Sequence, residues 1–168
     1  TQKGFIELAR GRREEAEQTF KYAIKLAPDA IEGYLALGSY YWALGRPKEA
    51  EQTFHTALKI KPTDAVTNRA LASLYLATAR TSEAEQYLRT VADTSGDPVS
   101  AMELANYYLI VGRSKDAITR LTPLASGDTK IPAARTMLAR AHAQSGDRAK
   151  AKAIVDEALK ANRHDLEA

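Results

Sequence analysis

Residues 31–62 of the chain read IEGYLALGSYYWALGRPKEAEQTFHTALKIKP. Apolar and small residues recur in this stretch every three or four positions, which is the spacing of one face of an α-helix. The pattern is interrupted once, at Gly45-Arg46-Pro47, where the glycine can end one helix and the proline can begin the next. The stretch therefore predicts two amphipathic helices joined by a short turn.

The landmarks of this stretch return along the whole chain. A repeat of about 34 residues that contains a helix, a turn and a helix is typical of α-solenoids, which are binding scaffolds far more often than enzymes. Small residues on such helices let paired helices approach closely. On the expected second helices, alanine recurs at intervals of 34, 34, 33 and 34 residues, at Ala16, Ala50, Ala84, Ala117 and Ala151.

These repeats predict a single array. We expect a partial repeat over residues 1–30, complete repeats over 31–64, 65–97, 98–131 and 132–165, and the start of a further repeat at 166–168. The last complete helix is expected over about 148–161. Pro123 falls inside an expected helix, where it removes a backbone hydrogen bond and should kink or shorten that helix.

The composition is ordinary for a globular protein and carries no strong charge signal. Hydrophobic residues make up 45% of the 168 residues, and 24 Lys and Arg stand against 21 Asp and Glu, for a net charge of +3. Because both signs are mixed along the chain, no basic block predicts binding to nucleic acid or to an anionic membrane. No apolar run approaches the roughly 20 residues of a membrane-spanning helix, so we expect no membrane insertion.

Two features bear on the compartment and on the parent protein. The chain has no cysteine, which fits either a reducing or an oxidising compartment, so the localisation stays open. It opens on Thr1, and we expect it to be part of a longer protein.

Side chains that could carry chemistry do not converge in the sequence. The histidines His55, His142 and His164 have no metal-like spacing to one another or to carboxylates. His142 takes the place that Tyr41 holds in its repeat, so we expect it to pack between helices, and we expect the other two histidines in solvent. The glycines are isolated turn residues and form no phosphate-binding loop. The sequence therefore predicts no catalytic residue, no metal site and no cofactor, and it argues against an enzyme.

The residues of the clearest repeat resemble the tetratricopeptide repeat pattern at nearly every signature position. They are Tyr34, Leu37, Gly38, Tyr41, Gly45, Ala50, Phe54, Ala57 and Pro62. The later repeats keep the pattern in weaker form, and the resemblance covers essentially the whole chain. It implies an all-α fold, a right-handed α-solenoid of stacked antiparallel helix pairs in which the first helix of each pair lines a concave groove.

On this resemblance, the helical period places a set of side chains in the groove. They are Leu35, Ser39, Trp42, Arg69, Ser73, Leu76, Met102, Asn106, Leu109, Thr136 and Arg140. Trp42 is the single tryptophan, and two interpretations of it stay open: an anchor for a ligand, or a cover for a neighbouring helix.

Chaperone-binding members of the family hold a peptide's terminal carboxylate with Lys, Asn and Arg. The corresponding residues here, Leu35 with Ser39, Ala70, and Val99 with Glu103, do not match that pattern. The predicted groove is moderately apolar and suits an extended or helical segment.

Two functions follow as hypotheses. The first is a scaffold that binds a protein or peptide partner in the groove, as part of a longer chain. The alternative is a structural module that self-associates through its terminal repeats, because the last helix carries an apolar stripe with no polar capping helix after it. The stripe consists of Ala151, Ile154, Val155, Ala158 and Leu159.

Overall fold

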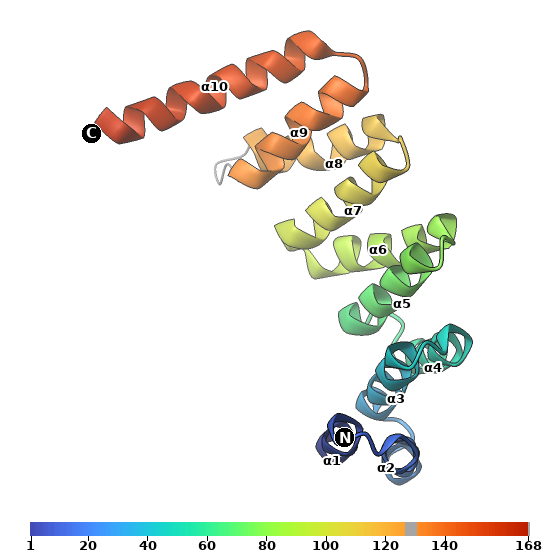
Figure 1. Cartoon of the computed structure of the whole chain (residues 1–168). Coiled ribbons are helices and arrows are strands. Elements are labelled where there is room, and N and C mark those ends of the chain that lie inside the picture. The colour runs from blue at the N-terminus through green and yellow to red at the C-terminus, as the bar shows by residue number, and fades with distance from the viewer. Residues whose placement is uncertain (127–130, 168) are drawn as a thin grey trace. The chain divides into compact units, whose positions relative to one another are not determined.

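The computed structural model describes residues 1–126 and 131–167, with side chains as far as residue 160. Within these residues the only regular secondary structure is α-helix, and there is no strand (Figure 1). The helices are α1 (Gln2–Ala9), α2 (Arg13–Leu26), α3 (Ile31–Ala43), α4 (Pro47–Ile60), α5 (Ala65–Ala77), α6 (Thr81–Ser95), α7 (Pro98–Ile110), α8 (Ser114–Ser126), α9 (Pro132–Gln144) and α10 (Arg148–Glu167).

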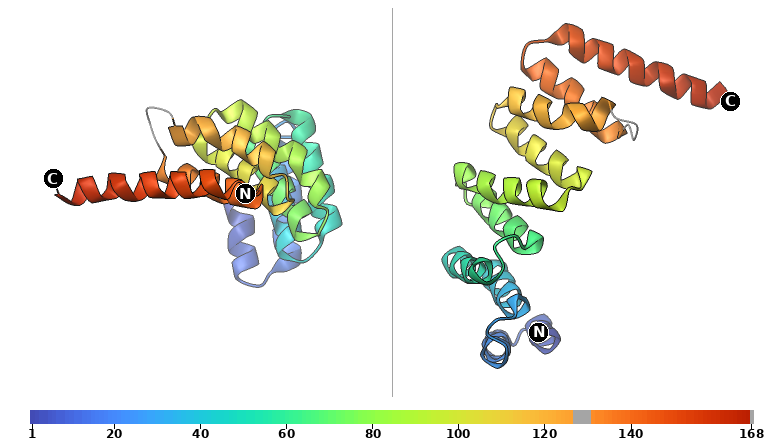
Figure 2. Two further views of the ribbon diagram at one scale, coloured as in Figure 1. Left: turned by 90° about the horizontal axis from the view of Figure 1, so that it is seen from above. Right: turned by 180° about the vertical axis from the view of Figure 1, so that it is seen from behind.

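The helices fall into two compact units, Thr1–Val91 and Ala92–Ala168, and each is described by itself. Unit 1 contains α1 to α5 and most of α6, and unit 2 contains the end of α6 and α7 to α10. Within each unit, short turns fold successive helices back on one another as antiparallel hairpins (Figure 1 and Figure 2). The chain is therefore an all-α solenoid built from helix pairs.

Glycine on the first helices of unit 1 allows the helices of a pair to approach closely. A Cβ atom added to Gly38 of α3 would lie only 2.5 Å from the ring of Phe54 in α4, and one added to Gly4 would lie 2.6 Å from the ring of Phe20. Phe20 and Phe54 are buried, as is Ala50 on α4. The small residues that the repeat pattern places on paired helices thus make room for a large aromatic ring in each pair.

The turn between paired helices has the same hydrogen bond in every repeat. The N–H of Arg46 donates to the carbonyl of Tyr41 at 2.9 Å, five residues back, and the N–H of Asp147 donates to His142 at 2.9 Å. The residue just before the donor has a positive φ, +70° at Gly45 and +59° at Ala79. Such a left-handed residue ends a helix, and glycine adopts it at less cost than alanine does.

The end of the last helix differs from the expectation. Helix α10 runs to Glu167 and does not end near residue 161, and residues 166 and 167 continue it. The reason lies in the sequence: Arg163 stands where Pro28 and Pro62 follow the ends of α2 and α4, so nothing removes the helical N–H. Pro123 lies inside α8, which runs to Ser126, and the residues that follow lie outside those described, so the expected kink or shortening of this helix stays a prediction.

Candidate functional site

The residues predicted to face a ligand in unit 1 are accessible from solvent. Ser39 and Trp42 on α3 and Ser73 and Leu76 on α5 are exposed, and Leu35 and Arg69 are half-buried. Trp42 is 39% exposed, a high value for so large a side chain. Trp42 and Leu76 lie one repeat apart in the sequence, at equivalent positions of their helices.

Large apolar side chains are exposed mainly on the first helices of unit 1. On its second helices the exposed ones are Tyr22 and Leu26, both on α2. The first helices expose five, which are Phe5, Ile6, Trp42, Val66 and Leu76. This uneven distribution gives the first-helix surface of unit 1 an apolar character that the core does not require.

The residues predicted in unit 2 divide differently. Asn106 on α7 and Thr136 and Arg140 on α9 are exposed, and Met102 is half-buried. The expectation for Leu109 is wrong, because its side chain is only 3% exposed and is not accessible to a ligand. Helix α9 packs against α7 as well as against α8.

Thr136 and Arg140 lie in a cleft between α9 and α10. The cleft has a volume of about 940 Å³. Its α9 side also includes Ala139 and Ala143, and its α10 side is formed largely by apolar residues. These are Ala151, Ile154, Val155, Ala158 and Leu159, the stripe identified in the sequence.

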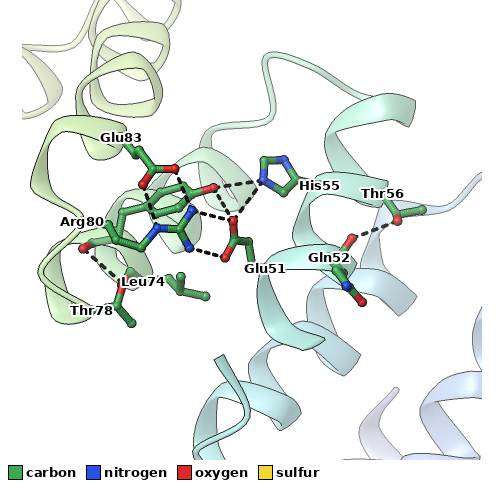
Figure 3. A network of polar contacts seen from close by, with 9 residues as sticks. Glu51, Gln52, His55, Thr56, Leu74, Thr78, Arg80 and Glu83 are labelled. Carbon is green, nitrogen blue, oxygen red and sulfur yellow. Dashed lines mark hydrogen bonds and ion pairs between the residues drawn. The ribbon is translucent and has the colours of Figure 1, made fainter. Parts of the chain in front are cut away.

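A polar cluster, here called the turn clasp, joins neighbouring repeats in unit 1. In its simplest form, an arginine at the turn lies over a tyrosine of the first helix and bonds an acidic residue three positions later. Arg80 lies 4.5 Å from the ring centre of Tyr75, and its Nε donates to Glu83 Oε1 at 2.7 Å. Arg80 Nη1 also donates to Glu51 Oε2 of the preceding repeat at 2.6 Å (Figure 3).

The same clasp forms one repeat earlier. Arg46 lies 4.4 Å from the ring centre of Tyr41, and it donates to Glu49 at 2.8 Å and to Glu17 at 3.1 Å. The hydroxyl of Tyr41 donates to Glu17 Oε1 at 2.9 Å. Hydrogen bonds from Lys21, Tyr41 and Arg46 lower the pKa of Glu17 from 4.5 to about 2. The Glu17 carboxylate is therefore a charged connector between repeats.

The expectation that His55 lies in solvent is only partly right. Its side chain is partly exposed, but Nε2 lies 3.0 Å from the hydroxyl of Tyr75 (Figure 3). Because that hydroxyl donates its proton to Glu51 at 2.8 Å, Nε2 of His55 must be the donor in the contact with Tyr75. Burial, followed by the bond to Glu51, raises the pKa of Tyr75. His55 therefore belongs to the turn clasp.

Repeat five, residues 132–165, carries the two turn positions of the clasp with exchanged charges. In unit 2, Arg113 still lies 4.6 Å from the ring centre of Tyr108 and donates to Asp116 at 2.8 Å. At the next turn, Asp147 takes the place of the arginine, and Lys150 takes the place of the acid. His142, in the tyrosine's place, is largely buried as expected, with Nδ1 3.8 Å from Asp147. His164 lies outside the residues whose side chains are described.

The clasp was missed in the sequence although a signal was present. Glu17 and Glu51 are separated by one repeat, as are Arg46 and Arg80. Partners that recur with the repeat and carry opposite charges are candidates for a contact between repeats. Chemically the clasp pairs charges and hydroxyl groups with one another and presents no activated nucleophile, so its role is structural.

Among the described residues, no three histidine or acidic side chains come together in a way that could hold a metal ion. None of the helices in the described part of the chain combines the length and the apolarity needed to cross a membrane.

Comparison with known proteins gives a family-level match over nearly the whole chain. The family model described as "Tetratricopeptide repeat" matches residues 7–66, 41–106 and 108–168. No curated protein matches the sequence.

Solved structures with similar folds are numerous, at low sequence identity. The crystal structure of MamA has a TM-score of 0.71 at 20% identity, covering 98% of this chain and 97% of that one. YrrB, described as a TPR protein with an unusual peptide-binding site, has a TM-score of 0.68 at 20% identity over 94% of this chain and 81% of its own. A tetratricopeptide repeat protein from Parabacteroides merdae has a TM-score of 0.74 at 18% identity over 98% and 66%. At these identities the likeness concerns the fold.

Proposed function

Since the chain belongs to the tetratricopeptide repeat family, we propose that it is a scaffold that binds a protein or peptide segment on the exposed surface of its first helices. The observation that carries this proposal is the exposure of Trp42 and Leu76 at equivalent positions of α3 and α5. Exposed apolar groups that gather on one kind of helix mark interaction surfaces more often than scattered ones do.

The chemistry of this surface suggests the class of ligand. Trp42 and Leu76 supply apolar contact area, and tryptophan is a frequent anchor of binding energy. Ser39 and Ser73 lie three residues before Trp42 and Leu76 on the same helices and offer hydroxyl groups to a peptide backbone. An extended or helical segment with regularly spaced apolar side chains fits such a surface. A similar fold, YrrB, carries a peptide-binding site according to its description.

The proposal is tested with peptides and a matched pair of variants. The probe is a panel of synthetic 12-residue peptides with Leu or Phe at helical or at alternating spacing, and binding is measured by calorimetry. For a peptide that binds, we expect Trp42→Ala to weaken binding about tenfold or more. Tyr22→Ala removes an exposed aromatic ring from α2 instead and should leave binding unchanged.

The outcome separates the two interpretations of Trp42. Circular dichroism first establishes that both variants keep the helical fold. Equal affinities of the Trp42→Ala variant and the parent chain, for every peptide that binds, would reject the first-helix surface as the binding site. A loss in Tyr22→Ala of the same size would point to the second helices instead.

A second candidate function is assembly of copies of this chain through their terminal helices. It is supported by the exposure of Ile6 on α1 and of Val155 and Leu159 on α10. Sedimentation velocity over a range of protein concentrations tests it, because a single monomeric species at every concentration would reject assembly.

A further inference from the structure

The contact between α2 and α3 joins two successive repeats within unit 1. Tyr40 of α3 is buried, and its ring lies 5.7 Å from that of Phe20 on α2. The Tyr40 hydroxyl donates to the carbonyl of Arg13 at 2.9 Å, and the hydroxyl of Tyr41 donates to Glu17. A first helix thus fits against the second helix of the preceding repeat through an apolar contact and a polar one.

Each side of this contact forms a series of equivalent residues. On the first helices the series is buried in every repeat but one, at Tyr40, Leu74, Tyr107 and Ala141. Its remaining member, Ile6 of α1, is 52% exposed. On the second helices Phe20, Phe54, Leu88 and Leu121 are buried, whereas Val155 of α10 is 47% exposed. Ile6 and Val155 are therefore complementary halves of one contact.

The cleft between α9 and α10 has the composition of a helix-binding groove. Val155 lies in it together with Ile154, Ala158 and Leu159. Leu159 is equivalent to Ile24, which in unit 1 lies against Gly33 of the first helix that follows. The cleft thus presents the residues with which α2 receives α3.

We propose that α1 of one copy of this chain docks in the α9–α10 cleft of a second copy, with Ile6 against Val155. This inference rests on the second candidate function and names its interface. The occupant follows from continuity with the internal contact: α1 is a first helix whose contact residue is uncovered, and α10 is a second helix whose contact residue is uncovered. Because the two surfaces differ, the association is head to tail, and copies can add at either end.

The charges at the junction are complementary. Glu7 of α1 stands at the position of Tyr41, and Lys152 of α10 stands at the position of Glu17. Within the chain, those positions are joined by the bond from the Tyr41 hydroxyl to the Glu17 carboxylate. Between copies, the same place would hold Glu7 opposite Lys152. Within one copy, the Glu7 carboxylate accepts a hydrogen bond from the hydroxyl of Thr19, and the exposed Lys152 pairs with Asp156, so docking would add a partner to each charge. The junction would thus keep a polar contact, with the carboxylate on the first helix, α1, and not on the second helix as within the chain.

The interface is tested by complementation between two variants. Ile6→Asp blocks α1 and leaves the cleft intact, whereas Val155→Asp blocks the cleft and leaves α1 intact. In sedimentation velocity we expect the parent chain to form species that grow with concentration and each variant alone to stay monomeric. An equimolar mixture of the two variants should form dimers and nothing larger, because it contains one competent pair of surfaces. Tyr22→Asp, on an exposed part of α2, is the control and should assemble as the parent chain does.

Each alternative outcome has a distinct meaning. A parent chain that stays monomeric rejects both the assembly function and this interface. Variants that still assemble on their own leave assembly standing and overturn this interface. Variants that are both monomeric but form no dimer when mixed overturn the head-to-tail arrangement.

Charge reversal provides an independent check on the register. Lys152→Glu should weaken assembly about fivefold or more, and adding Glu7→Lys in the same chain should restore it. Lys115→Glu changes the net charge equally at an exposed site on α8, so it controls for long-range repulsion. A double variant that assembles no better than Lys152→Glu alone, with an unchanged circular dichroism spectrum, would contradict the pairing of Glu7 with Lys152.

Discussion

Repeat two, at residues 31–64, and repeat five, at residues 132–165, begin from the same sequence plan and end in different states. In repeat two, Phe54 of α4 is buried against Gly38 of α3. In repeat five, Val155 of α10 takes the same position and is exposed, and the cleft beside it is open. The two hairpins nevertheless close their turns with the same backbone hydrogen bond, at 2.9 Å in both.

The comparison separates the requirements for forming a helical hairpin from the requirements for burying the contact residue of its second helix, here called sealing the pair. The turn needs only a residue that tolerates a positive φ and the backbone bond across it, which Gly45 and Gly146 both allow. Sealing the pair requires a large side chain on the second helix and a following first helix that covers it. Repeat two has both, since α5 packs against α4. The turn clasp adds charge pairing between neighbouring repeats in unit 1. In repeat five, Lys150 and Asp147 form the pair at the turn, but Ile118 stands where Glu17 and Glu51 supply the carboxylate of the preceding repeat.

The largest expected effect comes from emptying the sealed position. Phe54→Ala should lower the free energy of unfolding by about 3–5 kcal/mol, because it leaves a cavity beside Gly38. Val155→Ala at the equivalent position should cost less than about 1 kcal/mol, since the valine is already half in solvent. Urea denaturation of both variants measures the difference. Equal losses would contradict the distinction between a sealed and an open repeat.

Filling the small-residue position should have an intermediate effect. Ala84→Leu places a larger side chain at a position of α6 where the alanine is fully buried, and overpacking there should cost about 1–3 kcal/mol. Ala151→Leu, at the equivalent position beside the cleft, should be nearly neutral because the cleft has room for it. Thermal denaturation compares the two. If Ala84→Leu unfolded at the temperature of the parent chain, the close packing assigned to Ala84 would be wrong.

The smallest effect is electrostatic and depends on pH. The pKa of Glu17 is lowered to about 2 from the usual 4.5, so its contribution to stability is complete above pH 4.5 and is lost as the pH falls toward 2. At pH 6 we expect Glu17→Gln to cost about 1 kcal/mol, because its charged hydrogen-bond partners Lys21 and Arg46 are partly exposed to solvent. The difference from the parent chain should shrink between about pH 4.5 and 2.

A neighbouring carboxylate provides the control for this titration. Glu14→Gln alters an exposed acid in the first turn of α2 and should change the stability little at any pH. A Glu17→Gln variant whose stability differed from the parent chain by a constant amount from pH 6 to pH 2 would show that the carboxylate is not the source of the effect.

The helices could be predicted from the sequence because their signals are local. Gly45 and Pro47 are two positions apart in the sequence; α3 ends at Ala43, two residues before the glycine, and α4 begins at the proline. The end of α10 differs from the expectation because Arg163 occupies the position at which Pro28 and Pro62 follow α2 and α4, so the local stop signal is missing there. Local signals thus predict helix ends well where a glycine or proline marks the end of the helix.

The side-chain environment was harder to predict because it depends on the next repeat. His55 looked solvated because its partner Tyr75 is 20 residues away and on another helix pair. Leu109 shares its helical position with Trp42 and Leu76, yet it is buried while they are exposed. Whether such a residue faces a ligand or the core is decided by how closely the neighbouring helices pack, which the period of one helix does not contain.

The most direct test of the difference between the sealed and the open repeat is native-state hydrogen exchange, measured by mass spectrometry at a concentration where the chain is monomeric. The account predicts that amides of α4 exchange only through near-global unfolding, and that amides of α10 over residues 148–160 exchange at least about tenfold faster, because the apolar residues Val155 and Leu159 of this helix are exposed. Equal protection of α4 and α10 in the monomer would contradict it.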